Sequence, residues 1–538
     1  MRNERGNFVW KDLTKEAATC WVDNTYREIV GWSANNLFEP PKCAATTKLI
    51  KEMVFLLNNY NQDTPLAPLA LKIFFILPKL FFQKTHKKSK TRENVKAVTR
   101  RIDLWQTNNL DELLEEARTI QNRLPRLHHT NTHNVDKARN FANKMRHGKV
   151  AAALRALDDE QTGGVLPLNK ETIDLLKEKH PEPSDSDGLR LPGHRQTPNS
   201  VIYEMITGEL VWKIALQTQG SSGPSGLDAN GTRRLLSNTI HGSTAVDLCN
   251  ALASLARKTA TSPCHHLDSM IACRLIPLDK KPGCRPIGIG EVIRRIIGKC
   301  IMAVVKDDVT RAAGNLQVCA GQQAGGEAAI HAMRTIFEHK DCEAVLLVDA
   351  KNAFNSMNRK TMLHNVGIKC PTLAMYAENT YNKPSDLYID NSTLGNGCSV
   401  SVIKSKEGTT QGDPIAMAVY ALGLSVLQDE IAYEKTNVKQ VAYADDLSGA
   451  GKIIDLKKWW DMVNNHGPTI GYTPNAAKSV LIVKPEQYEF AVQTFRGSAV
   501  VITMKGQRHL GAVIGTQELK KEYVEKKVEE WVQEMSVI

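Results

Sequence analysis

Two acidic residues, Asp445 and Asp446, stand side by side in the stretch QVAYADDLSGAG, between an apolar run and a run of small residues. Adjacent carboxylates repel each other, so a fold gains nothing by placing both at a tight turn. A third acid, Asp349, ends the apolar run AVLLVDA, where an unpaired buried carboxylate would be costly. Together the three carboxylates could hold two magnesium ions, with manganese as an alternative, because such ions prefer oxygen ligands and substrate phosphates. These residues therefore indicate two-metal phosphoryl-transfer chemistry.

The elements that would gather these acids can be read from the same stretches. KQVAYA and LSGAG flank the aspartate pair and predict a hairpin with the pair at its turn. AVLLVDA predicts a buried strand that ends at Asp349. Short β-rich runs such as SVLIVK and AVVITM alternate with helical stretches in this half of the chain, which predicts a mixed α+β region.

Further segments surround the acids in a characteristic order. They are RLIPLDKKPGCRPIGIGEVIRRIIGK (274–299), LLVDAKNAFNSMNR, GTTQGDPIAMAVYALG (408–423), QVAYADD, GYTPNAAKSVLIV (471–483) and RHLGAVIGT (508–516). In this order they resemble the fingers motif, motifs A and B, the YxDD box, motif D and the primer-grip hairpin of reverse transcriptases. The resemblance covers roughly residues 265–535. The QGDP box and the RPI of the fingers motif are most similar to retroelements without long terminal repeats.

The resemblance implies a role for each matching residue. Asp349, Asp445 and Asp446 would bind the metal ions, and Lys478 would protonate the leaving pyrophosphate. The nucleotide would be held by Lys280, Lys281, Arg285, Phe354, Gln411 and Gly412. Primer and template would contact Tyr443, Asp413, Pro414, Leu510 and Gly511.

Most of these residues also have an ordinary structural interpretation, which the sequence leaves open. Asp349 could cap the end of a strand. The segment 411–414 could form only a turn that caps the following helix, and an aspartate directly before Pro414 fits that role. The predicted cationic residues could be solvated surface charges, and Tyr443 and Phe354 could be core aromatics.

The implied fold is α+β: a right-hand polymerase with palm and fingers and an antiparallel palm sheet, preceded by a mainly helical, basic N-terminal extension. The expected units are 1–180 for the extension, 195–262 for a helical region before the fingers, 263–345 for the fingers, 346–505 for the palm, and 506–538 for the primer-grip hairpin and a truncated thumb. Two stretches rich in Pro, Gly, Ser and Asp, 180–194 and 219–231, are the expected boundaries.

Charge is concentrated in one part of the chain. The net charge is +11, and residues 79–149 carry 17 Lys and Arg against 7 Asp and Glu, which leaves +10 in that segment. Such a segment predicts a phosphate-binding surface or a nuclear-targeting signal, with a solvated helical face as the alternative. The apolar run 66–82 contains two lysines and two prolines, so we expect a buried helix rather than a membrane span.

Other features of the sequence bound the cellular setting. The 11 cysteines form no CxxC pair, which favours a reducing compartment and argues against structural zinc. The N-terminal stretch has no apolar core of a signal peptide. We therefore expect a protein of the nucleus or cytoplasm with no membrane partner.

The expected function is that of an RNA-directed DNA polymerase, a nucleotidyltransferase that extends a DNA or RNA primer on an RNA template with deoxynucleoside triphosphates. Phe354 lies five residues after Asp349. The resemblance implies that a bulky ring at this position acts as a steric gate that would collide with a ribose 2′-hydroxyl. Two alternatives remain at this stage: a decayed or domesticated retroelement protein that binds RNA without polymerising, and a polymerase that uses ribonucleotides. Phe354 disfavours the second.

Overall fold

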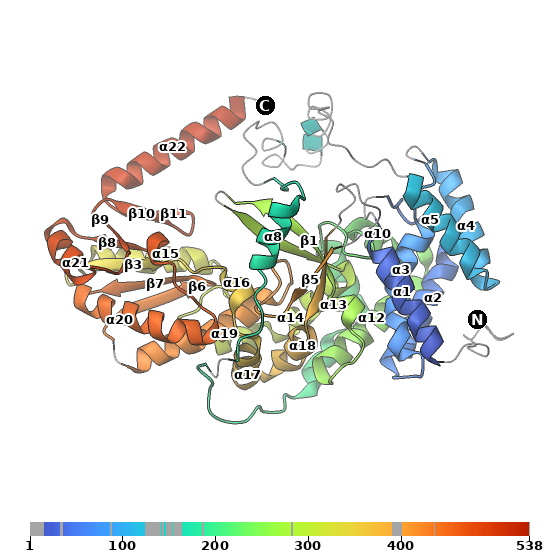
Figure 1. Cartoon of the computed structure of the whole chain (residues 1–538), viewed down its shortest axis with the longest axis horizontal. Helices are drawn as coiled ribbons and strands as arrows, with labels where there is room; N and C mark the ends of the chain where they lie inside the picture. The colour runs from blue at the N-terminus through green and yellow to red at the C-terminus, as the bar shows by residue number, and fades with distance from the viewer. Residues whose placement is uncertain are drawn as a thin grey trace.

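The structure is a computed structural model that describes residues 15–32, 36–86, 89–123, 141–142, 145–146, 153, 164–185, 188–280, 283–389, 401–434 and 436–536. Helices predominate in these ranges, and three sheets lie among them. Figure 1 shows the first helices gathered at one end of the molecule and the largest sheet at the other. The expected mixture of helices and sheets is confirmed.

The N-terminal end is a group of helices packed around α3 (Ala67–Phe81). The surrounding helices are α1 (Lys15–Val30), α2 (Ala44–Asn61), α4 (Thr91–Gln106) and α5 (Leu110–Arg123), each of which contacts α3. Almost every residue of α3 is buried, which confirms the predicted buried helix. No helix in the described ranges is both long and apolar enough to cross a membrane.

Two cations of the basic segment 79–149 lie in the protein interior, so that segment is not wholly a binding surface. The fully buried Lys79 donates hydrogen bonds to three carbonyl oxygens at the C-terminal end of α1, those of Ile29 (3.0 Å), Val30 (3.1 Å) and Trp32 (2.6 Å). Arg101, also buried, forms an ion pair with Glu116 at 3.1 Å. A cation at a helix C-terminus is stabilising because the last carbonyls carry partial negative charge.

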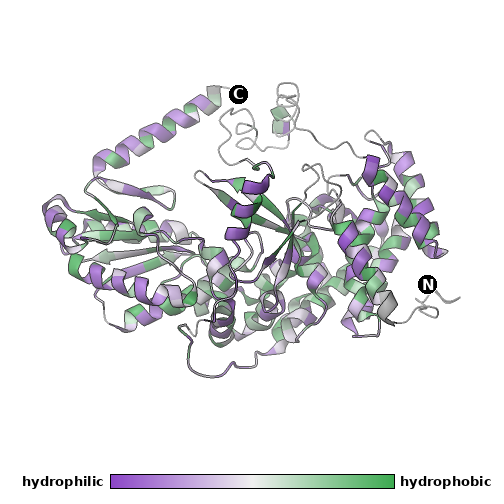
Figure 2. Cartoon of the chain, in the orientation of Figure 1, coloured by the Kyte–Doolittle hydropathy of each residue, from purple (hydrophilic) through white to green (hydrophobic). Residues whose placement is uncertain are grey.

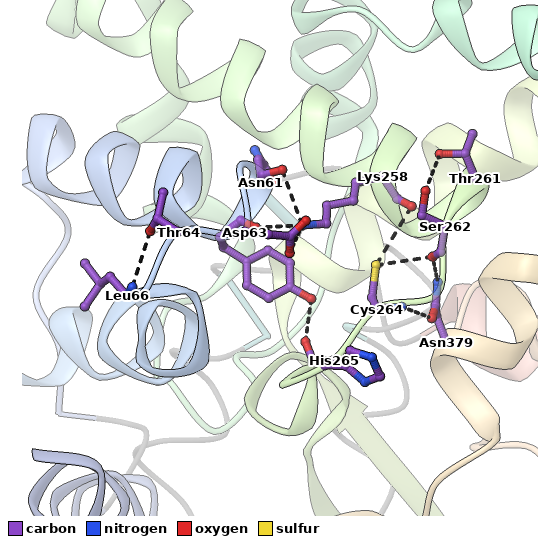
Figure 3. A network of polar contacts seen from close by, with 11 residues as sticks. Asn61, Asp63, Thr64, Leu66, Lys258, Thr261, Ser262, Cys264, His265 and Asn379 are labelled. Carbon is purple, nitrogen blue, oxygen red and sulfur yellow. Dashed lines mark hydrogen bonds and ion pairs between the residues drawn. The ribbon is translucent and has the colours of Figure 1, made fainter. Parts of the chain in front are cut away.

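Helix α12 (Ser243–Thr261) joins this helical group to the rest of the chain, and Figure 3 shows the contacts at its end. The Lys258 ammonium donates to the Asp63 carboxylate at 2.6 Å and to the Tyr60 carbonyl at 2.7 Å. The Tyr60 hydroxyl in turn donates to the carbonyl of His265 at 2.8 Å. The segment that leads to the first strand is therefore anchored on the N-terminal helices.

The remaining elements before the first strand are short. They are α8 (Lys170–Glu178), η1 (Ser200–Met205), α9 (Gly208–Gln217), α10 (Ala229–Leu236), α11 (Asn238–His241) and α13 (Asp268–Ile271).

The segment 219–231, expected as a boundary between units, lies largely in the interior, and its role as a boundary stays a prediction. Residues 222–227 are buried, and Glu291 accepts hydrogen bonds from both the backbone N–H and the hydroxyl of Ser225, each at 2.6 Å. A Cβ on Gly223 would lie 2.7 Å from the Glu291 nitrogen. The small residues here permit close packing. The other expected boundary, 180–194, is exposed or half-buried wherever the structure describes it.

A four-stranded sheet has the order β2 (Cys284–Gly290), β1 (Cys273–Asp279), β4 (Ser385–Ile389) and β5 (Ser401–Ser405). Strands β1 and β2 form an antiparallel hairpin in which Asp279 pairs with Cys284. The long helix α14 (Val292–Ala313) follows β2 directly.

The five-stranded sheet has the order β6 (Lys439–Tyr443), β7 (Asp446–Gly451), β3 (Ala344–Val348), β8 (Val480–Val483) and β9 (Val501–Thr503). All its pairs are antiparallel except β8 with β9. Alternate residues of β3 belong to two different cores: Leu346 and Val348 to the main one, and Val345 and Leu347 to a smaller one. Burial on both faces explains why this strand is a continuous apolar run.

The other elements that follow α14 are helices and a second hairpin. They are α15 (Gly325–Glu338), α16 (Ala353–Ser356), α17 (Arg359–Lys369), α18 (Pro371–Tyr381), α19 (Ala416–Tyr433), α20 (Ile453–His466), η2 (Gly467–Ile470), η3 (Ala476–Lys478), η4 (Pro485–Gln487), α21 (Tyr488–Thr494), the β10 (Gly506–His509)–β11 (Ala512–Gly515) hairpin and α22 (Gln517–Ser536). Helix α15 contacts β3, β6, β7 and β11, whereas α20 contacts β3 and β7. Helix α22 extends away from the sheet and is mainly hydrophilic (Figure 2).

Candidate active site

The three predicted acids meet at one edge of the five-stranded sheet. The expected hairpin is confirmed: β6 and β7 pair up to Tyr443 and Asp446, and Asp445 lies in the turn between them. Strand β3 pairs with β7 so that Val348 faces Leu447. Continued by one residue, this register sets Asp349 opposite Asp446. Residues almost a hundred positions apart in the chain are thereby brought to the same sheet edge.

The charges of these acids act on one another. Burial raises the pKa of Asp445, the Asp349 carboxylate raises it further, and Lys280 and Arg285 lower it. The pKa of Asp446 is raised to about 6, first by desolvation and then by Asp445 and Asp349. Asp445 is half-buried and Asp446 is exposed. The edge is therefore a region of excess negative charge that faces two cations.

Asp349 is held in place by the segment after α20, in which the sequence had indicated only a lysine. The Asn475 side-chain amide donates to the Asp349 carboxylate at 3.2 Å, and its backbone N–H donates to the Asp349 carbonyl at 2.7 Å. The Asp349 N–H donates to the Ser479 hydroxyl at 3.2 Å. Lys478 lies between these two residues and is exposed. Its role as a proton donor stays a prediction.

The backbone of Asp445 is fixed by another residue that sequence reasoning missed. The hydroxyl of the fully buried Tyr472 donates to the Asp445 carbonyl at 3.0 Å. Tyr472 and Asn475 both belong to the stretch GYTPNAAKS. Their position inside a motif was a signal, but the pairing with Asp445 and Asp349 required the structure.

The predicted cationic residues lie at the end of the β1–β2 hairpin. Lys280 and Arg285 are exposed, and their charges reach Asp445. Lys281 lies outside the described residues. The structure therefore brings Lys280 and Arg285 within electrostatic reach of the acids, and their role in holding a nucleotide stays a prediction.

The backbone of β2 packs closely on the segment that contains Gln411 and Gly412. The Gly288 N–H donates to the Gln411 carbonyl at 3.1 Å. A Cβ on Gly412 would lie 2.7 Å from the Gly288 carbonyl oxygen, and Gly412 has a φ of +110°. Gln411 is half-buried and Gly412 is exposed, so both lie at the surface next to the cationic hairpin.

Asp413 forms an ion pair in the interior. Its carboxylate forms an ion pair with Arg294 of α14 in which both side chains are almost fully buried (3% exposed for Arg294 and 2% for Asp413). The other carboxylate oxygen accepts the Ile415 N–H at 3.0 Å. The carboxylate thus stabilises the turn that leads into α19, whose N-cap residue is Ile415. The predicted contact of Asp413 with the template stays a prediction. Pro414 packs against α14, since a Cβ on Gly298 would lie 3.3 Å from its ring.

Phe354 is half-buried and stacks on Tyr420 of α19, with ring centroids 4.5 Å apart and an interplanar angle of 21°. Tyr420 is fully buried, and its pKa is raised by burial and then by Asp445. Tyr420 therefore contacts Phe354 on one side and is within electrostatic reach of Asp445. Its role in choosing the sugar stays a prediction.

The predicted primer contacts pack against the smaller core. Tyr443 and Leu510 are partly buried there, and Leu510 and Gly511, with φ of +46° and +85°, form the turn of the β10–β11 hairpin. The buried His509 lies 3.1 Å from the hydroxyl of Ser448 on β7, which attaches this hairpin to the sheet. Burial lowers the pKa of His509 to about 4.

The donor chemistry of the acidic edge suits a divalent cation, because mutually repelling carboxylates supply hard oxygen ligands. Across the described ranges, however, no group of three Asp, Glu, His or Cys side chains is arranged so that it could already hold a metal ion. The three aspartates are therefore close enough to interact electrostatically without forming a finished ligand cage.

A comparison with protein families identifies most of the second half of the chain. Residues 278–495 match the family model described as reverse transcriptase (RNA-dependent DNA polymerase). The match includes Asp349, both aspartates of the β6–β7 turn, and the segments that contain Phe354 and Gln411. The chain therefore carries a reverse transcriptase domain, the nucleotidyltransferase domain of RNA-directed DNA polymerases.

Proposed function

We propose that this reverse transcriptase domain is an active polymerase of a retroelement without long terminal repeats, and that it extends a primer on an RNA template by two-metal nucleotidyl transfer. The observation that carries the proposal is the convergence of Asp349 and Asp445 at one sheet edge, opposite Lys280 and Arg285. A site with carboxylates on one side and cations on the other fits a metal-bound triphosphate.

Asp349 and Asp445 are the proposed metal ligands, with Asp446 in support. When bound, two divalent ions would activate the primer hydroxyl and stabilise the charge on the leaving pyrophosphate. The residues of the chain contribute binding and orientation. Asn475 orients the Asp349 carboxylate through its 3.2 Å hydrogen bond. Lys280 and Arg285 bind the triphosphate through charge-assisted contacts, joined in this proposal by Lys281 from outside the described residues.

Nucleotide selection is assigned to Phe354, with Gln411 and Gly412 beside the incoming base and Lys478 as proton donor to pyrophosphate. Stacking on Tyr420 limits the movement of the Phe354 ring, which would let it exclude a 2′-hydroxyl. The primer end is assigned to Tyr443 and the hairpin turn at 510–511. This assignment favours deoxynucleotides over ribonucleotides.

The proposed units follow the sequence expectations: fingers over 263–345, palm over 346–505, and primer-grip hairpin and thumb helix over 506–538. The basic segment of the N-terminal extension is proposed to bind RNA through its exposed cations, such as Lys90, Arg92 and Lys96 on and next to α4. Replacing these three by Gln would reduce the slope of log K against log salt by about 0.7 for each phosphate that is no longer neutralised. An unchanged slope would remove this assignment. The proposed location is the nucleus or cytoplasm.

Primer extension on an RNA template tests the polymerase proposal. The full chain with Mg²⁺ is given either deoxynucleotides or ribonucleotides, alongside the variant Asp445→Asn and the control Asp307→Asn, an exposed acid of α14. The proposal expects deoxynucleotide incorporation by the wild type and the control, and its loss in Asp445→Asn with RNA binding retained. RNA binding without extension by the wild type would instead support a protein that has kept only binding. Preferred ribonucleotide incorporation would overturn the role of Phe354.

A further inference from the structure

A short segment between α14 and α15 adds backbone pairing to the outer edge of β6. The Ala442 N–H donates to the Leu316 carbonyl at 2.7 Å, and the Val318 N–H donates to the Ala442 carbonyl at 2.9 Å. Gln317 forms a parallel bridge with Ala442. The segment 316–318 therefore lies alongside the strand that leads into the aspartate turn.

The Gln317 side chain reaches from this segment to the turn itself. Its amide oxygen accepts the Ala444 N–H at 3.0 Å, and its amide nitrogen donates to the Ala444 carbonyl at 3.2 Å. Gln317 is fully buried and Ala444 is 3% exposed. One side chain thus satisfies both backbone polar groups of the residue directly before Asp445, in a place that water hardly reaches.

Ala444 needs this support because its backbone conformation is unfavourable for a residue with a Cβ. Its φ is +56°, in the left-handed region that glycine and asparagine adopt far more readily than alanine. Such conformations persist where the surroundings determine them, and they cluster at functional sites. With Gln317 on Ala444 and Tyr472 on the Asp445 carbonyl, the two turn residues are fixed from two sides.

We propose that Gln317 is a positioning residue for the polymerase reaction, which sets the Ala444 conformation and thereby the place of the Asp445 carboxylate. This inference rests on the proposed function and adds to it a residue from outside the acidic, cationic and nucleotide-facing motifs. Gln317 touches neither substrate nor metal in this scheme. It acts through the backbone of the turn.

The test compares two substitutions at Gln317 with a matched control in the full chain. Gln317→Leu removes both hydrogen bonds to Ala444. Gln317→Glu keeps the shape and the acceptor for the Ala444 N–H but, when ionised, loses the donor to the Ala444 carbonyl. Gln428→Leu is the control, because Gln428 is also fully buried and its side chain donates to the neighbouring Leu316 carbonyl at 3.1 Å without reaching the turn.

Two measurements separate positioning from general stability. Hydrogen exchange of a peptide spanning 440–450 reports protection of the Ala444 amide and needs neither metal nor substrate. Primer-extension kinetics report kcat and the KM for deoxynucleotide. Gln317→Leu is expected to exchange faster in this peptide and to reduce kcat by about 10- to 100-fold, since a displacement of about 1 Å can reduce rates by that order. The KM should change by less than about threefold, and Gln428→Leu should resemble the wild type in both measurements.

The variant Gln317→Glu adds a pH signature and remains informative if Gln317→Leu does not fold. As the pH falls, the carboxyl group that this substitution introduces becomes protonated and can again donate to the Ala444 carbonyl. The ratio of variant to wild-type kcat should therefore rise from pH 8 to pH 6. A flat ratio together with unchanged exchange would overturn the proposal, as would equal effects of Gln317→Leu and Gln428→Leu.

An inactive wild type would contradict the proposed function and not this inference. In that case the exchange measurement decides alone. Faster exchange at 440–450 in Gln317→Leu but not in Gln428→Leu supports the role of Gln317 in fixing the Ala444 conformation. Equal exchange in the two variants overturns it.

Discussion

Removing one carboxylate from the acidic edge should stabilise the metal-free protein. The pKa of Asp446 is about 6 in the folded chain, against about 3.9 for an unperturbed aspartate. Because the folded pKa is raised, the ionised carboxylate is less favourable in the folded state than in the unfolded chain. The stability contributed by the protonated form is present at low pH and is lost as the pH rises through about 6. At neutral pH the wild type therefore carries a penalty that Asp446→Asn removes.

The size of this effect follows from the pKa difference and the exposure of the side chain. A difference of about two in pKa corresponds to about 3 kcal/mol. Asp446 is exposed, so solvent screening reduces the expected gain to about 1 kcal/mol. For a cooperative unit of about 150–250 residues, that gain raises Tm by about 2–4 °C.

Thermal unfolding of metal-free protein measures this gain. Asp446→Asn should unfold at a higher temperature than the wild type at pH 7.5, and the difference should shrink steadily toward pH 4.5. Asp307→Asn should show no such pH dependence. Added Mg²⁺ should narrow the difference, because binding to the native site stabilises the wild type more.

The reasoning would be refuted by a variant that is no more stable than the wild type at pH 7.5. It would equally be refuted by a gain of the same size at pH 4.5, because that would show a cause other than ionisation of Asp446.

Three further predictions concern residues that support the site. Lys79→Met should lower the free energy of unfolding, measured in urea, by about 3 kcal/mol, because it leaves buried carbonyls at the end of α1 without a donor. The control Lys96→Met changes an exposed residue, and its free energy of unfolding should stay within about 0.5 kcal/mol of the wild-type value. The pKa of the buried His509 is lowered to about 4, so the unfolded chain binds the proton at a higher pH than the folded chain does. Stability should therefore fall by up to about 3 kcal/mol between pH 6.5 and pH 4. In thermal unfolding, His509→Asn should lose less stability than the wild type over this range, and an equal loss would contradict the assignment. Gly288→Ala should lower the free energy of unfolding by about 1–3 kcal/mol and raise the KM for deoxynucleotide, because the new Cβ would lie 2.4 Å from a Thr410 methyl. In the same steady-state assay the control Gly290→Ala should behave like the wild type, because its Cβ would lie 3.6 Å from the nearest atom.

Local patterns were enough to predict the elements that carry the chemistry. The β-rich run KQVAYA and the continuous apolar run before Asp349 specify strands, and the small residues after Asp446 allow the return strand. The buried helix α3 was likewise evident from a largely apolar run whose two lysines and two prolines argued against a membrane span. In each case the information lies within about 15 neighbouring residues, which is the range over which periodicity acts.

Contacts between distant segments could not be predicted in this way. Composition marked 219–231 only as a loop-like boundary and did not show that its small residues pack closely against Glu291. Gln317 carries no signal of its own, because its partner Ala444 is 127 positions away. The burial of Asp413 depends on its ion pair with Arg294, and a sequence cannot show which of many arginines lies in the interior.

The buried ion pair between Arg294 and Asp413 has a consequence for how the domain can move. It joins the start of α14 to the turn that begins α19, and separating the two would strand opposite charges away from water. These two elements should therefore travel as one rigid body. Any closure over a bound nucleotide would then have to move other elements relative to this pair, such as the β1–β2 hairpin with the exposed Lys280 and Arg285.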